Sequence, residues 1–320
     1  MAIPRRVFIG LAGAAALVRP AFAADKVTAG TLGGQAPLWP FYIATHKGFF
    51  TAQNLDVEIS FAQSGAAVTQ QLTAGSFDVA LSVGINDPIH AIDKGASVAI
   101  VRIVGNAAPY VLIGKKGLKT IADLKGKTVC IGSAADMTTI YFKRMAAAGG
   151  LKDGDYTVLS AGVGAARYAA LKAGVADAAV VLPPVNFQAE KAGFVTIAFA
   201  PDYVKDLPFT GMAVFKPWAN AHVEIVKRVL AATDASIAWF ADPAHRSEAV
   251  DLLVQTAHAT KEDAAASYDM LRRVRYFEPT SKVSRAKLQN LINEERRAGN
   301  IGPTLTADRL VMPGVTELTD

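Results

Sequence analysis

Short apolar runs alternate with longer helical stretches over most of the chain. Residues 27–32 predict a first strand, and residues 55–61 predict a second one in which every other residue is apolar and would share one face. Between them, a glycine-rich turn leads to Pro37, which suits the first turn of a helix that ends near His46. Gly48 can supply the left-handed residue that stops this helix. Strands and helices that alternate in this way predict parallel α/β layers.

One unit of this pattern occurs twice, at a separation of 99 residues (164 − 65 and 177 − 78). Gly65 and Gly164 begin the two copies, and Asp78 and Asp177 end them. In each copy a glycine turns the chain out of a strand into a helix, a second glycine closes the helix, and the aspartate leads into a buried strand. The repeat predicts two similar lobes. Chance similarity between alanine-rich helices is the alternative.

The rest of the chain continues the sheets and then becomes helical. Further strands are predicted at 128–131, 156–159 and 178–182, with weaker candidates at 195–199 and 212–215. Helices are predicted at 137–148, 223–240, 243–258 and 283–298, with one more after the capping pair Thr260 and Asp263. We expect the helices after residue 220 to pack beside the first lobe rather than to form a separate domain.

The N-terminus has the features of an export signal. Arg5 and Arg6 precede an apolar run at 7–18, and Ala21-Phe22-Ala23 supplies the small-x-small pattern of a cleavage site. The run is shorter than the roughly 20 residues of a membrane-spanning helix. We expect cleavage near Ala23-Ala24 and a periplasmic mature protein, exported by the general secretory or the twin-arginine route. A buried N-terminal core helix is the alternative.

Charge and cysteine content further restrict the kinds of protein that this chain can be. The formal charge is +5, but removal of residues 1–23 leaves 30 basic against 28 acidic residues and no basic run. Nucleic-acid binding therefore has no support. The single cysteine, Cys130, excludes an intramolecular disulfide and lies in an apolar run that predicts a buried strand residue.

Several short stretches, in this order and spacing, resemble the substrate-binding proteins of nitrate, sulfonate, taurine and thiamine-precursor ABC transporters. These stretches are residues 47–50 with 55–58, then 72–80, 123–129 and 170–179. The resemblance implies a type II periplasmic-binding-protein fold: an α/β protein with two lobes, a hinge and a helical C-terminal region. It also implies that the protein is a monomer that binds a small organic solute, delivers it to an inner-membrane ABC permease and needs no cofactor.

The resemblance also implies a division of the chain. Residues 1–23 would be the signal peptide, residues 24–105 with 212–320 would form one lobe, and residues 106–211 would form the other. The chain would cross between the lobes near Gly105-Asn106 and near Thr210-Gly211.

Ligands in open α/β sheets bind where the strands end and the helices begin. This rule predicts a cleft lined by loops of both lobes. The candidate ligand-binding residues are Gln35, Trp39, Gln63, Ser64, Gly65, Val83, Gly84, Asn86, Asn106, Ser133, Met137, Thr138, Gly164, Pro183, Asn186 and Thr210.

Three helix starts, at Gly65, Asp136 and Gly164, would offer unpaired N–H groups to an anion, in loops with no basic residue before Arg167. Core packing is the alternative role for Trp39. Helix capping is the favoured role for Asp87 and Asp136.

No enzyme constellation is found. The five histidines show no metal-type spacing with Cys130 or with one another, and no nucleophile elbow or phosphate loop occurs. We expect neither catalysis nor a bound metal. The alternatives are an enzyme of the same fold, similar to thiamine-pyrimidine synthases, and a sensory module for a membrane kinase. The ligand's identity and charge stay open among sulfonates, carboxylates, heterocycles and small inorganic anions.

Overall fold

Two five-stranded sheets organise the protein. The computed structural model describes residues 23–33 and 35–320, so the predicted signal sequence up to residue 22, and Gly34, lie outside the described residues. The first sheet has the spatial order β2 (Leu55–Ala62), β1 (Asp25–Leu32), β3 (Val79–Gly84), β10 (Thr210–Phe215) and β4 (Val98–Gly105). The second has the order β7 (Thr157–Ser160), β6 (Thr128–Ile131), β8 (Ala178–Val181), β5 (Val111–Gly114) and β9 (Val195–Phe199).

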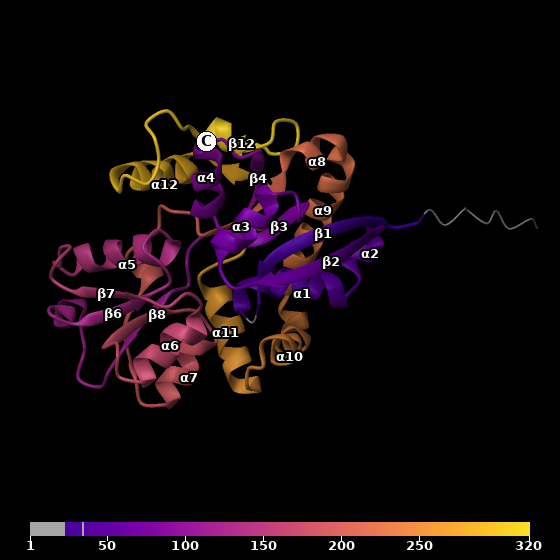
Figure 1. Ribbon diagram of the computed structural model, residues 1–320. Coiled ribbons are helices and arrows are strands. Elements are labelled where there is room, and N and C mark those ends of the chain that lie inside the picture. The colour runs from indigo at the N-terminus through magenta and orange to yellow at the C-terminus, as the bar shows by residue number, and fades with distance from the viewer. Residues whose placement is uncertain (1–22, 34) are drawn as a thin grey trace, which may run out of the picture.

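The two sheets share one topology. In each, three parallel strands are followed by one antiparallel strand, which itself pairs antiparallel with an edge strand. The antiparallel strand of each sheet is added after the chain has crossed over: β5 follows β4 into the second sheet, and β10 returns to the first. Figure 1 shows the sheets as two bodies side by side, each flanked by helices.

The repeated sequence unit accounts for part of this likeness. Helix α3 (Gly65–Thr73) and helix α6 (Gly164–Lys172) begin and end 99 residues apart, as the repeat predicts. The closing glycines, Gly75 and Gly174, both have positive φ, which a residue with a side chain rarely adopts.

The aspartate of each repeat joins two neighbouring strands. Oδ2 of Asp78 accepts the Thr28 N–H at 2.8 Å, and Oδ2 of Asp177 accepts the Thr128 N–H at 3.0 Å. In return, the backbone N–H of each aspartate donates to the carbonyl of the same threonine. The turn before the third strand is thus fixed to the first strand in the same way in both sheets.

Helices cover both sheets, and most of the C-terminal ones lie against the first. The other N-terminal helices are α1 (Trp39–His46), α2 (Phe49–Ala52) and α4 (Asn86–Asp93). The second sheet carries α5 (Met137–Ala148) and α7 (Val185–Lys191). The C-terminal region contains α8 (Lys216–Ala221), α9 (Val223–Ala241), α10 (Arg246–Ala257), α11 (Lys261–Arg273), α12 (Arg285–Arg297), α13 (Ala307–Leu310) and a small parallel pair, β11 (Val283–Ser284) with β12 (Leu318–Thr319).

The C-terminal helices contact both halves of the molecule. Helix α9 packs on α1, α2 and β2, while α12 packs on α4, as expected for helices beside the first lobe. Helix α11 also contacts α7, and it lies between the two bodies in Figure 1. Lys191 on α7 pairs with Glu262 and Asp263 on α11, and Arg144 on α5 pairs with Glu294 on α12.

The expected fold class, two sheets with flanking helices and a helical C-terminal region, is confirmed. Cys130 is a fully buried strand residue, and burial raises the pKa of its thiol. No helix in the described part of the chain combines the length and apolar character needed to cross a membrane.

Candidate functional site

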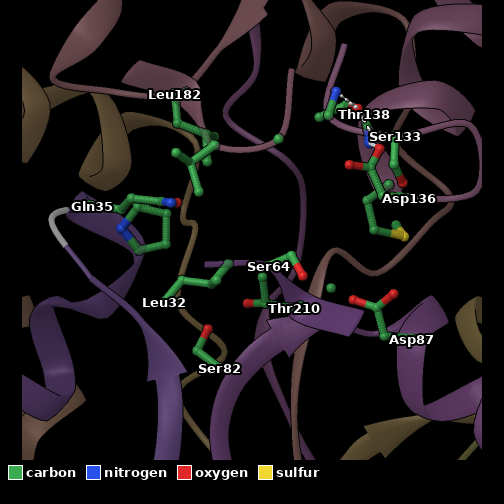
Figure 2. A pocket seen from close by; sticks show the side chains of 18 of the residues that line it. Leu32, Gln35, Ser64, Ser82, Asp87, Ser133, Asp136, Thr138, Leu182 and Thr210 are labelled. Carbon is green, nitrogen blue, oxygen red and sulfur yellow. Dashed lines mark hydrogen bonds between the residues drawn. The ribbon is translucent and has the colours of Figure 1, made fainter. Parts of the chain in front are cut away.

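A cavity of about 190 Å³ lies between the two sheets. Most of its lining comes from the loops that follow β1, β2 and β3 in the first sheet and β6, β7 and β8 in the second, and Tyr110, Phe209 and Thr210 near the two crossovers complete it. Parallel strands place their carboxyl ends at the same edge of a sheet, so these six loops gather there. Figure 2 shows the lining side chains converging from both sides.

Most of the predicted site residues line this cavity. They are Gln35, Gln63, Ser64, Gly65, Gly84, Asn86, Ser133, Met137, Thr138, Gly164 and Thr210. The rule that selected them uses only the chain order of strands and loops, and the structure brings residues as distant as Gln35 and Thr210 to one space. Their contact with a ligand stays a prediction.

Five predicted residues do not line it. Trp39 is fully buried, donates its indole N–H to the Ala249 carbonyl at 2.7 Å and packs on Phe240 and Tyr268. Its role is therefore core packing, because the first helix turns this side chain toward the C-terminal helices. Val83 is also fully buried, since alternation along β3 points it away from the face of Ser82 and Gly84.

The other three lie behind or beside the cavity. Asn106 donates to Glu278 Oε2 at 2.6 Å, and it lines, with Asn186, a separate wider groove of about 950 Å³. Pro183 follows the lining residue Leu182, and its carbonyl accepts the Ala36 N–H at 3.5 Å.

Asp87 is the principal residue that local sequence rules misplaced. The Asp-Pro pair predicts a helix cap, but α4 begins at Asn86 with Ile85 at the capping position. Asp87 lies within the first turn, and its carboxyl lines the cavity (Figure 2). Burial, and then the nearby Asp136, raise the pKa of Asp87 to about 7.

Asp136 has the predicted capping role and also lines the cavity. Its Oδ1 accepts the N–H groups of Thr138 at 2.9 Å and Thr139 at 3.3 Å. Burial raises the pKa of Asp136, while the bond from the Thr138 hydroxyl and the charge of Arg167 oppose that rise. The carboxylate therefore accepts hydrogen bonds from the N–H groups of Thr138 and Thr139 at the start of α5, which would otherwise be free to bind a ligand.

Arg167 is the basic residue of the cavity lining. It stands one turn into α6, is 4% exposed, and donates through Nη1 to the Gly162 carbonyl. Its Nε has no hydrogen-bond partner among the described residues. The sequence did contain a signal that Arg167 lines the cavity: it lies three residues after Gly164, and residues three apart share a helix face.

The three helix starts differ in whether a side chain caps their backbone N–H groups. Ser64 caps α3 by accepting the Ala67 N–H at 3.1 Å, and Asp136 caps α5. The start of α6 at Gly164 has no side-chain cap. An anion would therefore find its open backbone N–H groups at α6, beside Arg167.

Two glycines leave room for the carboxylates. A Cβ on Gly65 would collide with Oδ2 of Asp87, and a Cβ on Gly132 would collide with Oδ2 of Asp136. Each acidic side chain thus lies directly over backbone of the loop that lines the same cavity. Direct bonds also cross the cavity: the Asn86 amide donates to the Ala135 carbonyl at 2.5 Å.

The described residues contain no group of three or more His, Cys, Asp or Glu side chains arranged to hold a metal ion.

Comparison with known proteins identifies the family. The NMT1/THI5-like family model matches residues 35–246, and the chain belongs to that family. No curated protein sequence matches the chain.

Solved structures share the fold. The alkanesulfonate-binding protein SsuA from Xanthomonas axonopodis pv. citri, bound to MOPS, is 17% identical with a TM-score of 0.76, over 93% of this chain and 100% of that one. The sulphonate-binding protein SsuA from Escherichia coli is 19% identical with a TM-score of 0.73, over 91% and 98%. The nitrate-binding protein NrtA from Synechocystis PCC 6803 is 17% identical with a TM-score of 0.72, over 89% and 84%. The fold is therefore the type II periplasmic-binding-protein fold.

Proposed function

We propose that the protein is a periplasmic solute-binding protein that captures a small organic molecule between its two halves and delivers it to an ABC importer. The observation that carries the proposal is the cavity at the carboxyl ends of both sheets, with lining from six strand-to-helix loops. A solute there would contact both halves, so it would favour the closed arrangement over an open one. A permease could then recognise the closed surface.

Family membership and the N-terminal sequence support this role. Three proteins of similar fold are named for the sulfonates or nitrate that they bind. The arginine pair, the apolar run at 7–18 and the cleavage pattern at Ala21–Ala23 support export. We further propose that the protein acts as a monomer with the lobe boundaries predicted from the sequence, and that it binds its solute without altering it.

The test is a thermal-shift screen of the mature chain with sulfonates, nitrate, pyrimidines, flavins and aromatic carboxylates. A ligand at 100 times its Kd should add roughly 2.7 kcal/mol to the free energy of unfolding. The ligand should be recovered unchanged after incubation. Turnover of the ligand would contradict a pure binding role.

A matched pair of variants locates the site. Gly164→Leu places a side chain in the cavity without a close clash, because a Cβ there would meet only Arg167 Nη2 at 3.7 Å. Ala165→Leu adds the same side chain to the next, solvent-exposed position of α6. We expect the first variant to abolish the ligand-induced shift and the second to keep it. Equal binding by both variants would place the site elsewhere.

A further inference from the structure

A second hollow lies beside the two chain segments that cross between the sheets. This crossover groove has a volume of about 950 Å³ and lies between the crossing segments near Asn106 and Lys205, helix α7, strand β9 and the end of α11. Helices α7 and α11 contact each other where the two bodies meet (Figure 1). A molecule in the groove would therefore contact both halves of the protein.

The groove has a surplus of positive charge. Its charged lining residues are Lys205, Arg273, Arg275 and Lys287, against Glu190 and Asp202. Among the described residues, no ion pair or side-chain hydrogen bond engages Lys205, Arg273 or Arg275. The Arg273 guanidinium lies over the Phe199 ring, 5.6 Å from its centroid, and Glu190 already accepts the Thr196 hydroxyl at 2.5 Å. Three cations of the groove thus lack an acidic partner within the described fold.

Arg275 stands where a side chain is unfavourable. It follows the C-cap Val274 of α11 and has a φ of 47°. Its N–H donates to the Arg272 carbonyl at 3.1 Å. The next N–H, that of Tyr276, donates to the Leu271 carbonyl at 3.0 Å, which completes a Schellman ending, where glycine is usual. The exposed guanidinium makes no ion pair or hydrogen bond in the described structure that would offset this cost.

A buried amide in the lining is also unpaired. Asn186 of α7 lines the groove and is 1% exposed. Neither its side-chain nitrogen nor its side-chain oxygen has a hydrogen-bond partner among the described residues. Buried polar groups are normally paired, because an unmade hydrogen bond is costly. A bound molecule or a water is needed to satisfy this donor and this acceptor.

Apolar side chains provide much of the remaining lining, and they are Val111, Phe199, Pro201, Val204, Met270 and Val274. We infer that the crossover groove is a second binding site, for an organic anion that carries at least two negative charges on an apolar body. Its carboxylate or phosphate groups would bind Lys205, Arg273 and Arg275 through charge-assisted hydrogen bonds. This site does not depend on the function proposed for the cavity.

The groove and the cavity share both crossing segments. The first segment has Asn106 at the groove and Tyr110 at the cavity, and the second has Lys205 at the groove and Thr210 at the cavity. An anion that bridges these segments and α11 would favour the present arrangement of the two halves. Its binding should therefore restrict the motion of both segments.

Calorimetry of the mature chain with two anionic probes, trimesate and phenyl phosphate, tests the site. Benzyl alcohol is the uncharged control, and inorganic phosphate is the control without an apolar body. The variant is Arg275→Gly, and His258→Gly is its matched control. His258 ends α10 outside the groove with a φ of 51°, so both variants relieve the same kind of backbone strain, but only Arg275→Gly removes a cation of the groove. Lys205→Ala, with the exposed Lys116→Ala as its control, is a second pair.

We expect both anions to bind the wild type, His258→Gly and Lys116→Ala equally, and to bind Arg275→Gly and Lys205→Ala about tenfold more weakly. Arg275→Gly should melt no lower than the wild type, because glycine adopts this backbone conformation freely. Binding should weaken as salt is added, and both control probes should bind weakly to every protein. Hydrogen exchange of residues 106–110 and 201–210 should slow when trimesate binds the wild type.

The cavity variant Gly164→Leu separates this site from the cavity, and it should bind trimesate as the wild type does. Binding lost in Gly164→Leu but kept in Arg275→Gly would place the anion in the cavity, which would overturn the inference and leave solute binding standing. Equal affinity in the wild type and Arg275→Gly, or no binding of either anion, would overturn it too. Unchanged hydrogen exchange in the bound protein would overturn the effect on the two halves.

Discussion

At the scale of single residues, Asp87 links the stability of the fold to pH. Asp87 has a raised pKa, so its folded state holds a proton that the unfolded chain releases at lower pH. Between pH 4 and pH 7 the folded form therefore binds more protons than the unfolded form, and stability falls as the pH rises. Ionised Asp87 therefore destabilises the fold at neutral pH.

Replacement of Asp87 by Asn should reveal this cost. Without ligand, the free energy of unfolding of Asp87→Asn should exceed that of the wild type at pH 8, by up to about 4 kcal/mol at ~1.4 kcal/mol per pKa unit. The gap should shrink as the pH falls toward 4. Urea unfolding at several pH values measures it, and a constant gap would show that Asp87 titrates normally.

The sequence could not reveal this role of Asp87. Its local context, an aspartate before proline, fits a helix cap, and Asp136 shows that an aspartate does cap α5 beside the second sheet. The two aspartates differ in their tertiary environment. Asp87 lies near a loop of the second sheet, with Asp136, that comes about 50 residues later in the chain. Arg167 was overlooked for the same reason, although its helix was placed correctly.

At the scale of helices and strands, the local sequence pattern predicted many elements correctly. Residues 128–131 and 195–199 form the strands expected there, and residues 137–148 form the expected helix, because apolar runs, capping residues and glycine stops are all local. No expected strand covered β4 or β5. Both are buried along their whole length and show no alternation of apolar and polar positions, and, unlike the equally buried β8, neither follows an aspartate of the repeat.

The repeated aspartates give a prediction for these elements. Asp78→Ala removes bonds from the Thr28 N–H at 2.8 Å and the Thr28 hydroxyl at 2.7 Å, and Asp177→Ala removes its bond from Thr128 and its pairing with Lys115. We expect each substitution to lower the free energy of unfolding by about 1–3 kcal/mol. Chemical denaturation measures the loss; a neutral effect at either site would show that the two copies are not energetically equivalent.

The whole molecule is held in its present arrangement by contacts between its halves. Arg144 on α5 reaches Glu294 on α12 at 2.6 Å and Asp206 on the returning crossover at 3.1 Å. These partners lie more than 60 residues away in sequence, so the residues around Arg144 do not predict them. An ion pair of this exposure contributes up to about 1 kcal/mol.

Arg144→Ala should therefore shift the ligand-free protein toward an open form, by about fivefold in the equilibrium. Small-angle scattering should show a larger radius of gyration, and solute affinity should fall a few-fold. Lys143→Ala is the matched control, because Lys143 pairs with Asp153 beside the same sheet. A radius unchanged in Arg144→Ala, or enlarged equally in both variants, would contradict this role.

The position of β10 has a consequence for synthesis. Because β10 lies between β3 and β4, the first sheet cannot reach its final order until residue 215 has left the ribosome. The second sheet takes all its strands from residues 111–199 and faces no such delay. The half that is made first is therefore completed last: β1, β2 and β3 can pair with one another, but β4 has no neighbour in the sheet until β10 arrives.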